Sequence, residues 1–220
     1  MMNEYPVNYQ IAVYKTNKKL AEFNDKLKPT LLENYAHIHA RGDKLPDGRK
    51  LRSCIGVVLQ DYSKGAGQQT VRVSANLAPE FFPYALSRAA MGVETFDFQE
   101  DKIFGVPDTN GRCQVTKVTI KRASVGSDGK PRRYPWYICI ENGRAVKEPT
   151  QTGGIHMKAG SYTAEKKVFI NINDFDFYGL LHSVNRFIEI WELTNGPRLI
   201  RDATKLMEAY YMQHPSGGRG

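Results

Sequence analysis

Residues 70–89, TVRVSANLAPEFFPYALSRA, and residues 168–187, VFININDFDFYGLLHSVNRF, are two versions of one pattern. Each begins with apolar and polar side chains in alternation, which predicts a β-strand. Each then passes through Asn or Asp into an aromatic-rich stretch with helical spacing, and carries Ser and Arg near its end. The copies lie roughly 100 residues apart and predict a fold built twice from strands followed by a helix.

The rest of the chain supplies further strands and helices, with Gly- and Pro-containing turns between them. We expect an α+β fold of antiparallel β-sheets with extra N-terminal and C-terminal helices. The expected strands are residues 8–15, 51–62, 68–76, 94–98, 111–125, 132–142 and 165–173. The expected helices are residues 20–39, split by Pro29, then 76–92, 174–193 with Asp174 as its cap, and 198–213 after a stop at Asn195-Gly196-Pro197.

These elements form one globular domain over residues 1–214, in which two pseudo-repeats span about 50–92 and 94–195. The first repeat has a full set of strands only if residues 8–15 supply one. We expect residues 215–220, PSGGRG, to be a flexible tail.

Composition limits the classes of function. The 220 residues carry a net charge of +8, which favours acidic partners such as nucleic acid. No apolar run is long enough to cross a membrane and no signal-peptide pattern is present, so we expect a soluble, cytoplasmic protein without a membrane partner. Three widely spaced cysteines indicate neither zinc nor redox chemistry.

Most of the positive charge lies in one stretch, because residues 111–148 hold nine basic residues against three acidic ones. Lys117 and Lys121 share one face of the strand over 111–125, and Thr116, Val118 and Ile120 share the other. Basic side chains beside aromatic rings can contact phosphates while bases stack on the rings. The predicted contacts are Lys117, Lys121, Arg122, Lys130, Arg132, Arg133, Tyr134, Tyr137, Arg144 and Lys147, with Tyr62, Lys64 and Arg72 in the first repeat. Trp136 is either a stacking residue or part of the core.

The element order and the two strand-to-helix junctions, Val71–Ala89 and Val168–Phe187, resemble the Whirly family and its shorter relatives, the positive cofactor four coactivators. The resemblance covers roughly residues 50–195 and implies four antiparallel strands followed by a helix, once or twice per chain. It also implies that helices pack subunits together into a homo-oligomer, and that strands hold single-stranded DNA or RNA.

The predicted function is therefore non-catalytic binding of a single-stranded nucleic acid, with DNA as the expected partner, and with no cofactor or metal. Two alternatives stay open. One is a structural or scaffold protein, of a phage or mobile element, that binds an acidic protein surface. The other is a metal-dependent nuclease using Asp108, Glu165 and Lys167.

Overall fold

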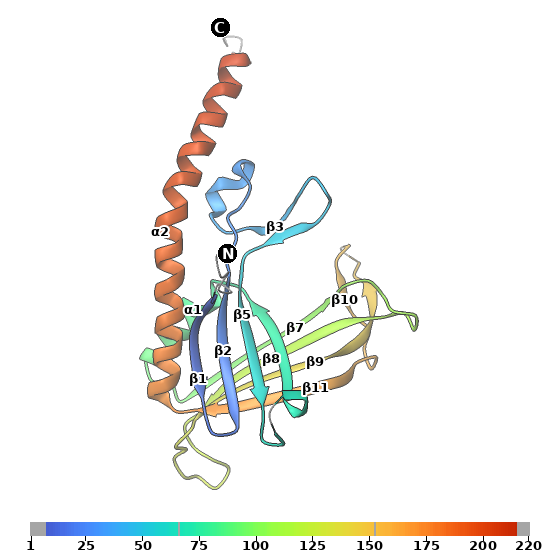
Figure 1. The fold of residues 1–220 in the computed structure, drawn as a ribbon, viewed down its shortest axis with the longest axis vertical. Coiled ribbons are helices and arrows are strands. Elements are labelled where there is room, and N and C mark those ends of the chain that lie inside the picture. The colour runs from blue at the N-terminus through green and yellow to red at the C-terminus, as the bar shows by residue number, and fades with distance from the viewer. Residues whose placement is uncertain (1–7, 66, 152, 215–220) are drawn as a thin grey trace, which may run out of the picture.

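The computed structural model describes residues 8–65, 67–151 and 153–214, and shows a mixed α+β fold with antiparallel sheets, as the sequence predicts. Two sheets pack with their strands crossing, and a long C-terminal helix runs along one side and extends beyond them (Figure 1). Each sheet is followed in the chain by a helix, so the strands-then-helix order occurs twice.

Sheet 1 has the strand order β1-β2-β5-β6 and is wholly antiparallel. Its elements are β1 (Gln10–Lys15), β2 (Lys19–Lys26), β5 (Cys54–Asp61) and β6 (Val71–Leu77), followed by α1 (Phe81–Ala90). In β6 the residues Val73, Ala75 and Leu77 are buried while Arg72, Ser74 and Asn76 are exposed. One face of sheet 1 therefore builds the core, and β6 lies at its edge.

Sheet 2 has the order β7-β8-β9-β11, with the short β10 extending the pairing of β9. Its elements are β7 (Thr95–Phe104), β8 (Arg112–Ala123), β9 (Trp136–Pro149), β10 (Ile155–Met157) and β11 (Thr163–Ile172), followed by α2 (Asp174–Gln213). The predicted alternation in β8 is present: Val118 and Ile120 are buried, whereas Lys117 and Lys121 are only partly so.

A small hairpin outside both sheets is formed by β3 (Arg41–Lys44) and β4 (Lys50–Arg52), after a short 3-10 helix, η1 (Leu32–His37); a second one, η2, covers Gly67–Gln69. The buried ring of His39 ties this region to its neighbours. Its Nδ1 lies 2.9 Å from Ser53 Oγ, its Nε2 lies 2.9 Å from Glu192 Oε1, and the ring stacks on Trp191. The start of β5 and helix α2 therefore hold the base of the hairpin.

Trp136 belongs to the core, which answers the question that the sequence left open. It is 0 % exposed and stacks on Phe177, with ring centroids 4.0 Å apart. Its Nε1 donates a hydrogen bond of 2.7 Å to Asp174 Oδ1, so the buried indole N–H has a partner. Sheet 2 and the first turn of α2 are thereby joined.

The predicted N-terminal helix over residues 20–39 is wrong, since the chain forms β2 there and Pro29 makes an isolated bridge with His39. Ala21 and Phe23 are buried by strand alternation. Thr16 Oγ1 accepts the N–H of Lys19 and helps to close the turn before β2. Cross-strand pairing overrides the helical preference of Lys, Leu, Ala and Glu here. Because β1 and β2 belong to sheet 1, the strands followed by α1 extend over residues 10–90 and not only over the predicted 50–92.

The predicted stop at Asn195-Gly196-Pro197 is also wrong, because α2 is continuous through Pro197. Pro197 deprives the Leu193 carbonyl of its helical donor, but Leu193 is 73 % exposed and water can reach it. The N-cap is Asn173, whose side chain accepts the N–H of Asp176, and not Asp174 as predicted. Asp174 is free to bind Trp136 and a neighbouring arginine instead.

None of the helices in the described residues is long and apolar enough to span a membrane. The predicted flexible tail, residues 215–220, lies outside the described residues.

Candidate functional site

The face of sheet 2 that packs on sheet 1, its inner face, changes character along the strands. Residues paired across β7, β8, β9 and β11 form rungs, and two successive inner rungs are Phe98-Ile120-Ile138-Ile170 and Glu100-Val118-Ile140-Val168. The next two are Lys102-Thr116-Asn142-Lys166 and Phe104-Gln114-Arg144-Thr163. The face is therefore mainly apolar where it covers the core and polar at its far end.

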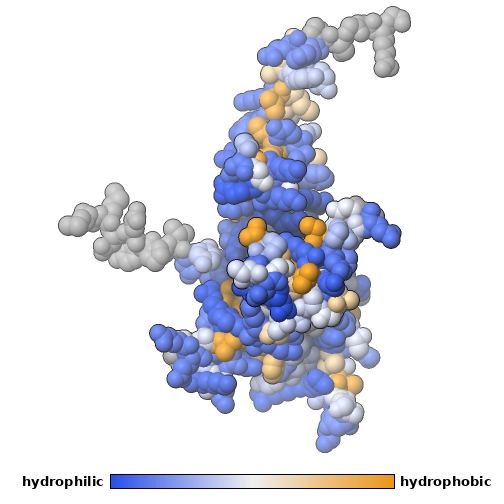
Figure 2. Space-filling view, turned by 90° about the vertical axis from the view of Figure 1, so that its right-hand side faces the viewer, coloured by the Kyte–Doolittle hydropathy of each residue, from blue (hydrophilic) through white to orange (hydrophobic). Residues whose placement is uncertain are grey.

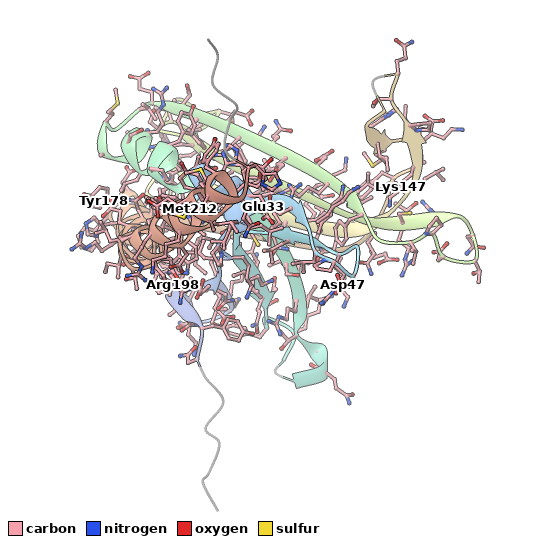
Figure 3. All side chains as sticks on the ribbon, turned by 90° about the horizontal axis from the view of Figure 1, so that it is seen from above. Glu33, Asp47, Lys147, Tyr178, Arg198 and Met212 are labelled. Atoms are coloured by element: carbon pink, nitrogen blue, oxygen red, sulfur yellow. The ribbon has the colours of Figure 1, made fainter. Side chains whose placement is uncertain are left out.

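The polar end of this face forms one wall of a cleft with a volume of about 1060 Å³. The rest of it is lined mainly by the edge strand β6 and the β3–β4 hairpin, with Lys26 at the end of β2, Cys54 at the start of β5 and residues 78–80 before α1. Seen from above, Asp47 in the turn of the hairpin and Lys147 on β9 lie on the same side of the molecule, away from Tyr178 on α2 (Figure 3). Strands from both sheets thus contribute side chains to one open concave surface.

The cleft is strongly basic. Its lining includes three carboxylates, Glu80, Glu100 and Glu165, against eight lysines and arginines. The basic residues are Lys26, Arg41, Lys50, Arg52, Arg72, Lys102, Arg144 and Lys166.

Each of the three carboxylates already has a basic partner within the cleft. Glu80 binds Arg41 at 3.0 Å, Glu100 binds Lys102 at 2.9 Å and Glu165 binds Arg144 at 2.9 Å. Lys102 also donates to the backbone carbonyl of Asn76, and Lys26 donates to the side-chain oxygen of the same residue. These pairs fix three of the cations and leave the others without a carboxylate.

Four exposed cations of the cleft, Lys50, Arg52, Arg72 and Lys166, have no ion pair or side-chain hydrogen bond with any part of the chain that the structure describes. They come from both walls, since Lys166 is on β11, Arg72 on β6, and Lys50 and Arg52 on β4. Unneutralised charge on facing walls attracts an anion that can reach both of them.

The two sheets are held at a fixed distance across the cleft by Asn142. Its side-chain amide accepts the N–H of Ser74 and donates to the Ser74 carbonyl, each at 2.9 Å, and it also donates to Thr116 Oγ1. Ser74 lies on the free edge of β6, so the amide takes the place of a neighbouring strand. The edge is thereby satisfied at the floor of the cleft.

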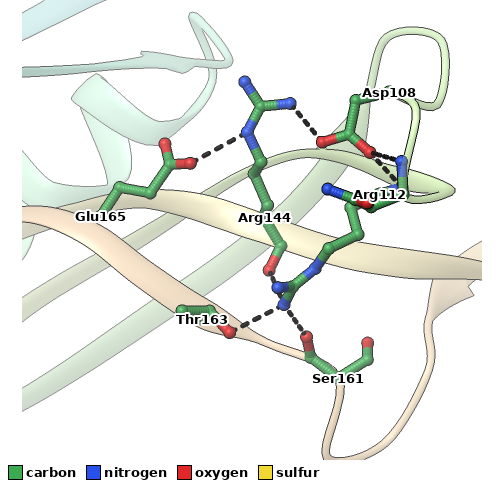
Figure 4. A network of polar contacts seen from close by, with 7 residues as sticks. Asp108, Arg112, Arg144, Ser161, Thr163 and Glu165 are labelled. Carbon is green, nitrogen blue, oxygen red and sulfur yellow. Dashed lines mark hydrogen bonds and ion pairs between the residues drawn. The ribbon is translucent and has the colours of Figure 1, made fainter.

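Arg144 is the centre of a polar network at the end of sheet 2 (Figure 4). Its guanidinium binds Asp108 and Glu165 at 2.9 Å each, while Arg112 donates to the carbonyls of Arg144 and Ser161 and to Thr163 Oγ1. The backbone N–H of Arg112, with that of Asn110 and the Arg144 guanidinium, lowers the pKa of Asp108 below its usual value. The network holds β9, β11 and the loop before β8 together.

This network occupies the carboxylates of the nuclease alternative. Asp108 and Glu165 do lie close together, but the guanidinium of Arg144 stands between them. Lys167 is directed elsewhere and binds Glu141 at 2.7 Å. Among the described residues no cluster of three or more His, Cys, Asp or Glu side chains could hold a metal ion.

The predicted basic face of β8 is the outer face of sheet 2, and its cations are paired. Lys117 binds Asp101 at 3.2 Å and Lys121 binds Asp97 at 3.0 Å. Tyr137 stacks on Phe169, whose ring also lies under the ammonium of Lys19 at 3.7 Å. This face has the residue types that the sequence predicted, but far less free charge than the cleft.

Arg122, another predicted contact, is turned to the interior. Its side chain is 9 % exposed and makes two hydrogen bonds of 3.0 Å to Asp174, and it also donates to the Val93 carbonyl. The Arg122 guanidinium, together with the Trp136 N–H, lowers the pKa of Asp174. Arg122 therefore joins sheet 2 to α2.

The remaining predicted contacts do not converge. Lys130, Arg132, Arg133 and Tyr134 lie in the loop between β8 and β9, at the end of sheet 2 opposite to Arg144. Lys147, beside Arg144, donates to the carbonyl of Gly105. Tyr62 directly follows β5 and donates to the carbonyls of Thr16 and Lys19 at the β1–β2 turn. Lys64 lies two residues further along, in the loop after β5. Of the thirteen predicted residues, the cleft contains Arg72 and Arg144.

Sequence reasoning missed six cations of the cleft: Lys26, Arg41, Lys50, Arg52, Lys102 and Lys166. Lys26 lies in the helix predicted over residues 20–39, and Lys50 lies outside every predicted strand and helix. A signal does exist in β9 and β11, because the inner positions run from Ile138 to Arg144 and from Ile170 to Lys166. It becomes readable only once the register between strands is known.

No family model matches the chain, and no curated protein or solved structure matches it either.

Proposed function

We propose that this protein binds single-stranded nucleic acid, without catalysis, in the basic cleft between its two sheets. The observation that carries the proposal is the set of four unpaired cations, Lys50, Arg52, Arg72 and Lys166, on facing walls of the cleft. A phosphate backbone laid along the cleft would release counterions and neutralise them.

The remaining lining groups favour a single strand over a duplex. Gln114 offers its side-chain amide, Asn76 offers the NH₂ group of its amide, and Phe104, which is 45 % exposed, offers a ring. Rings can stack on bases, and amides can bond their Watson–Crick edges, only where the bases are not enclosed in a double helix. Few groups of this kind are present, so little sequence preference is expected.

The order of elements also supports the proposal. A Whirly-like assignment implies four antiparallel strands followed by a helix, and this chain has a four-stranded sheet followed by α1 and a five-stranded sheet, in which β10 is short, followed by α2. We include that assignment in the proposal. The binding surface we propose is the cleft, in place of the outer face of β8.

The test is a binding titration of labelled single-stranded DNA, single-stranded RNA and duplex DNA by fluorescence anisotropy. The cleft variant is Lys50→Gln with Arg52→Gln. The control is Lys117→Gln with Lys121→Gln, which removes the same charge from the outer face of sheet 2. We expect the cleft variant to weaken single-strand binding by about tenfold and the control to change it little.

Equal loss in both variants would mean that binding follows net charge and has no site in the cleft. No binding of any of the three nucleic acids at low salt would sink the proposal and leave an acidic protein surface as the partner.

A further inference from the structure

The part of α2 that extends beyond the sheets carries an exposed row of mainly apolar residues. Apolar surface recurs along this part of the helix (Figure 2). The row consists of Ile190, Leu193, Pro197, Ile200, Thr204, Met207 and Tyr211, and all seven are exposed. We call it the seam.

The seam has the spacing of a coiled coil. The steps between its members alternate between three and four residues over the whole row. Such a spacing keeps the row on one side of a helix that winds around a second helix. Leu193 is 73 % exposed, Ile200 47 % and Tyr211 63 %, so no described part of the chain covers the seam.

A different stripe of α2 packs on the protein itself. Gly196, Leu199 and Ala203 are buried, and the Cα of Gly196 faces Ile38 next to η1. The seam is adjacent to this stripe and turned away from it. Covering the seam therefore does not compete with the contacts that hold α2 to the body.

The charges beside the seam select the partner and its direction. Arg201 directly follows Ile200, and Glu208 directly follows Met207. Ile200 and Met207 lie seven residues apart, at equivalent positions of the seven-residue repeat, so Arg201 and Glu208 are equivalent too. In an antiparallel pair of identical helices these positions face each other, so Arg201 of each copy meets Glu208 of the other. Such a contact is self-complementary, as two-fold symmetry requires.

A parallel pair lacks this match. In that arrangement Arg201 faces Gly196 and Glu208 faces Ala203, neither of which is charged, and both are buried against the body. We propose that the C-terminal part of the seam, residues 200–211, binds the same residues of a second copy of this chain, with the two α2 helices antiparallel. Ile200 then lies opposite Tyr211, and Thr204 opposite Met207, whereas Ile190, Leu193 and Pro197 lie outside the paired stretch. This inference is independent of the proposed function.

The test is a charge swap on the full-length chain, followed by sedimentation equilibrium at micromolar concentration. Arg201→Glu and Glu208→Arg, each alone, place like charges opposite each other at both ends of the pair. We expect each to raise the dimer dissociation constant by about tenfold, and the double variant to restore it. Lys205→Glu, an equal change of charge away from the seam, is the control and should leave the constant unchanged.

Ile200→Glu should abolish the dimer, and far-UV circular dichroism should show an intact fold because the side chain is exposed. A wild-type chain that stays monomeric at these concentrations overturns the proposal. Failure of the double variant to restore association overturns it too, because only the antiparallel pair brings these two positions together.

Discussion

Asp174 has a structural role that differs from its predicted role as a helix cap. As a predicted helix cap it would be replaceable by any good cap. In the structure its carboxylate binds the guanidinium of Arg122, whose side chain is 9 % exposed. The same carboxylate accepts the N–H of the buried Trp136 ring, which is the only polar group of that ring. Removing it leaves the indole N–H without a partner and leaves the guanidinium with the Val93 carbonyl alone.

We predict that Asp174→Ala lowers the free energy of unfolding by about 2–3 kcal/mol, because a largely buried guanidinium and a buried N–H lose their acceptor. Urea denaturation measures this as a lower midpoint at an unchanged slope. The matched control is Asp97→Ala, which breaks the exposed pair with Lys121 and should cost less than about 1 kcal/mol. Equal costs in the two variants would contradict the role of Asp174 as the partner of buried groups.

Among the elements, the sequence predicts β1, β8 and β11 closely, but it ends β7 and β9 early, lacks β10, places β2 in a helix and divides α2. A long strand with strict alternation, such as β8, can be recognised in the sequence. The burial of Val118 and Ile120 confirms it. The short β2 has residues of high helix propensity, and only its pairing with β1 and β5 makes it a strand. Contacts between distant segments decide such cases, and a single sequence does not display them.

Helix α2 was divided in two for a related reason. Gly196 and Pro197 stop an isolated helix, but here Gly196 packs against Ile38 and the Leu193 carbonyl left over by Pro197 is open to water. Packing and solvation thus offset two unfavourable residues.

We predict that Pro197→Ala raises the free energy of unfolding by about 1–3 kcal/mol, because Ala restores the N–H that the Leu193 carbonyl lacks and removes the clash of the ring. The measurement is urea unfolding at low protein concentration, where association makes no contribution. Thr204→Ala, on the same exposed row, is the control and should change stability only slightly. A destabilised Pro197→Ala variant would show that the proline is required at that point of the helix.

For the whole molecule, charge is distributed in a way that its net value of +8 conceals. The outer face of sheet 2 is rich in basic residues but compensated, as Lys117 with Asp101 and Lys121 with Asp97 show. The cleft has five cations in excess of its carboxylates, eight against three. A count of residues along the sequence locates basic stretches, whereas only the fold shows which charges remain free, so the candidate site was largely out of reach of sequence analysis.

We predict a salt dependence that reflects these five charges. If each neutralises one phosphate of a single strand, the logarithm of the binding constant should fall against the logarithm of the salt concentration with a slope of about −3.5. The Lys50→Gln, Arg52→Gln variant should make this slope shallower by about 1.4. Anisotropy titrations over a series of salt concentrations measure both values. A slope unaffected by the cleft variant would place the phosphate contacts elsewhere.

The change from apolar to polar rungs along sheet 2 has a consequence for how this protein can be altered. Cys113, Val115 and Ala145, at the polar end of the sheet, are buried but do not belong to the main core. The wall that carries Lys102 and Lys166 is therefore supported by a small core of its own. Substitutions that change the charge of that wall can be introduced without repacking the interior that folds the rest of the chain.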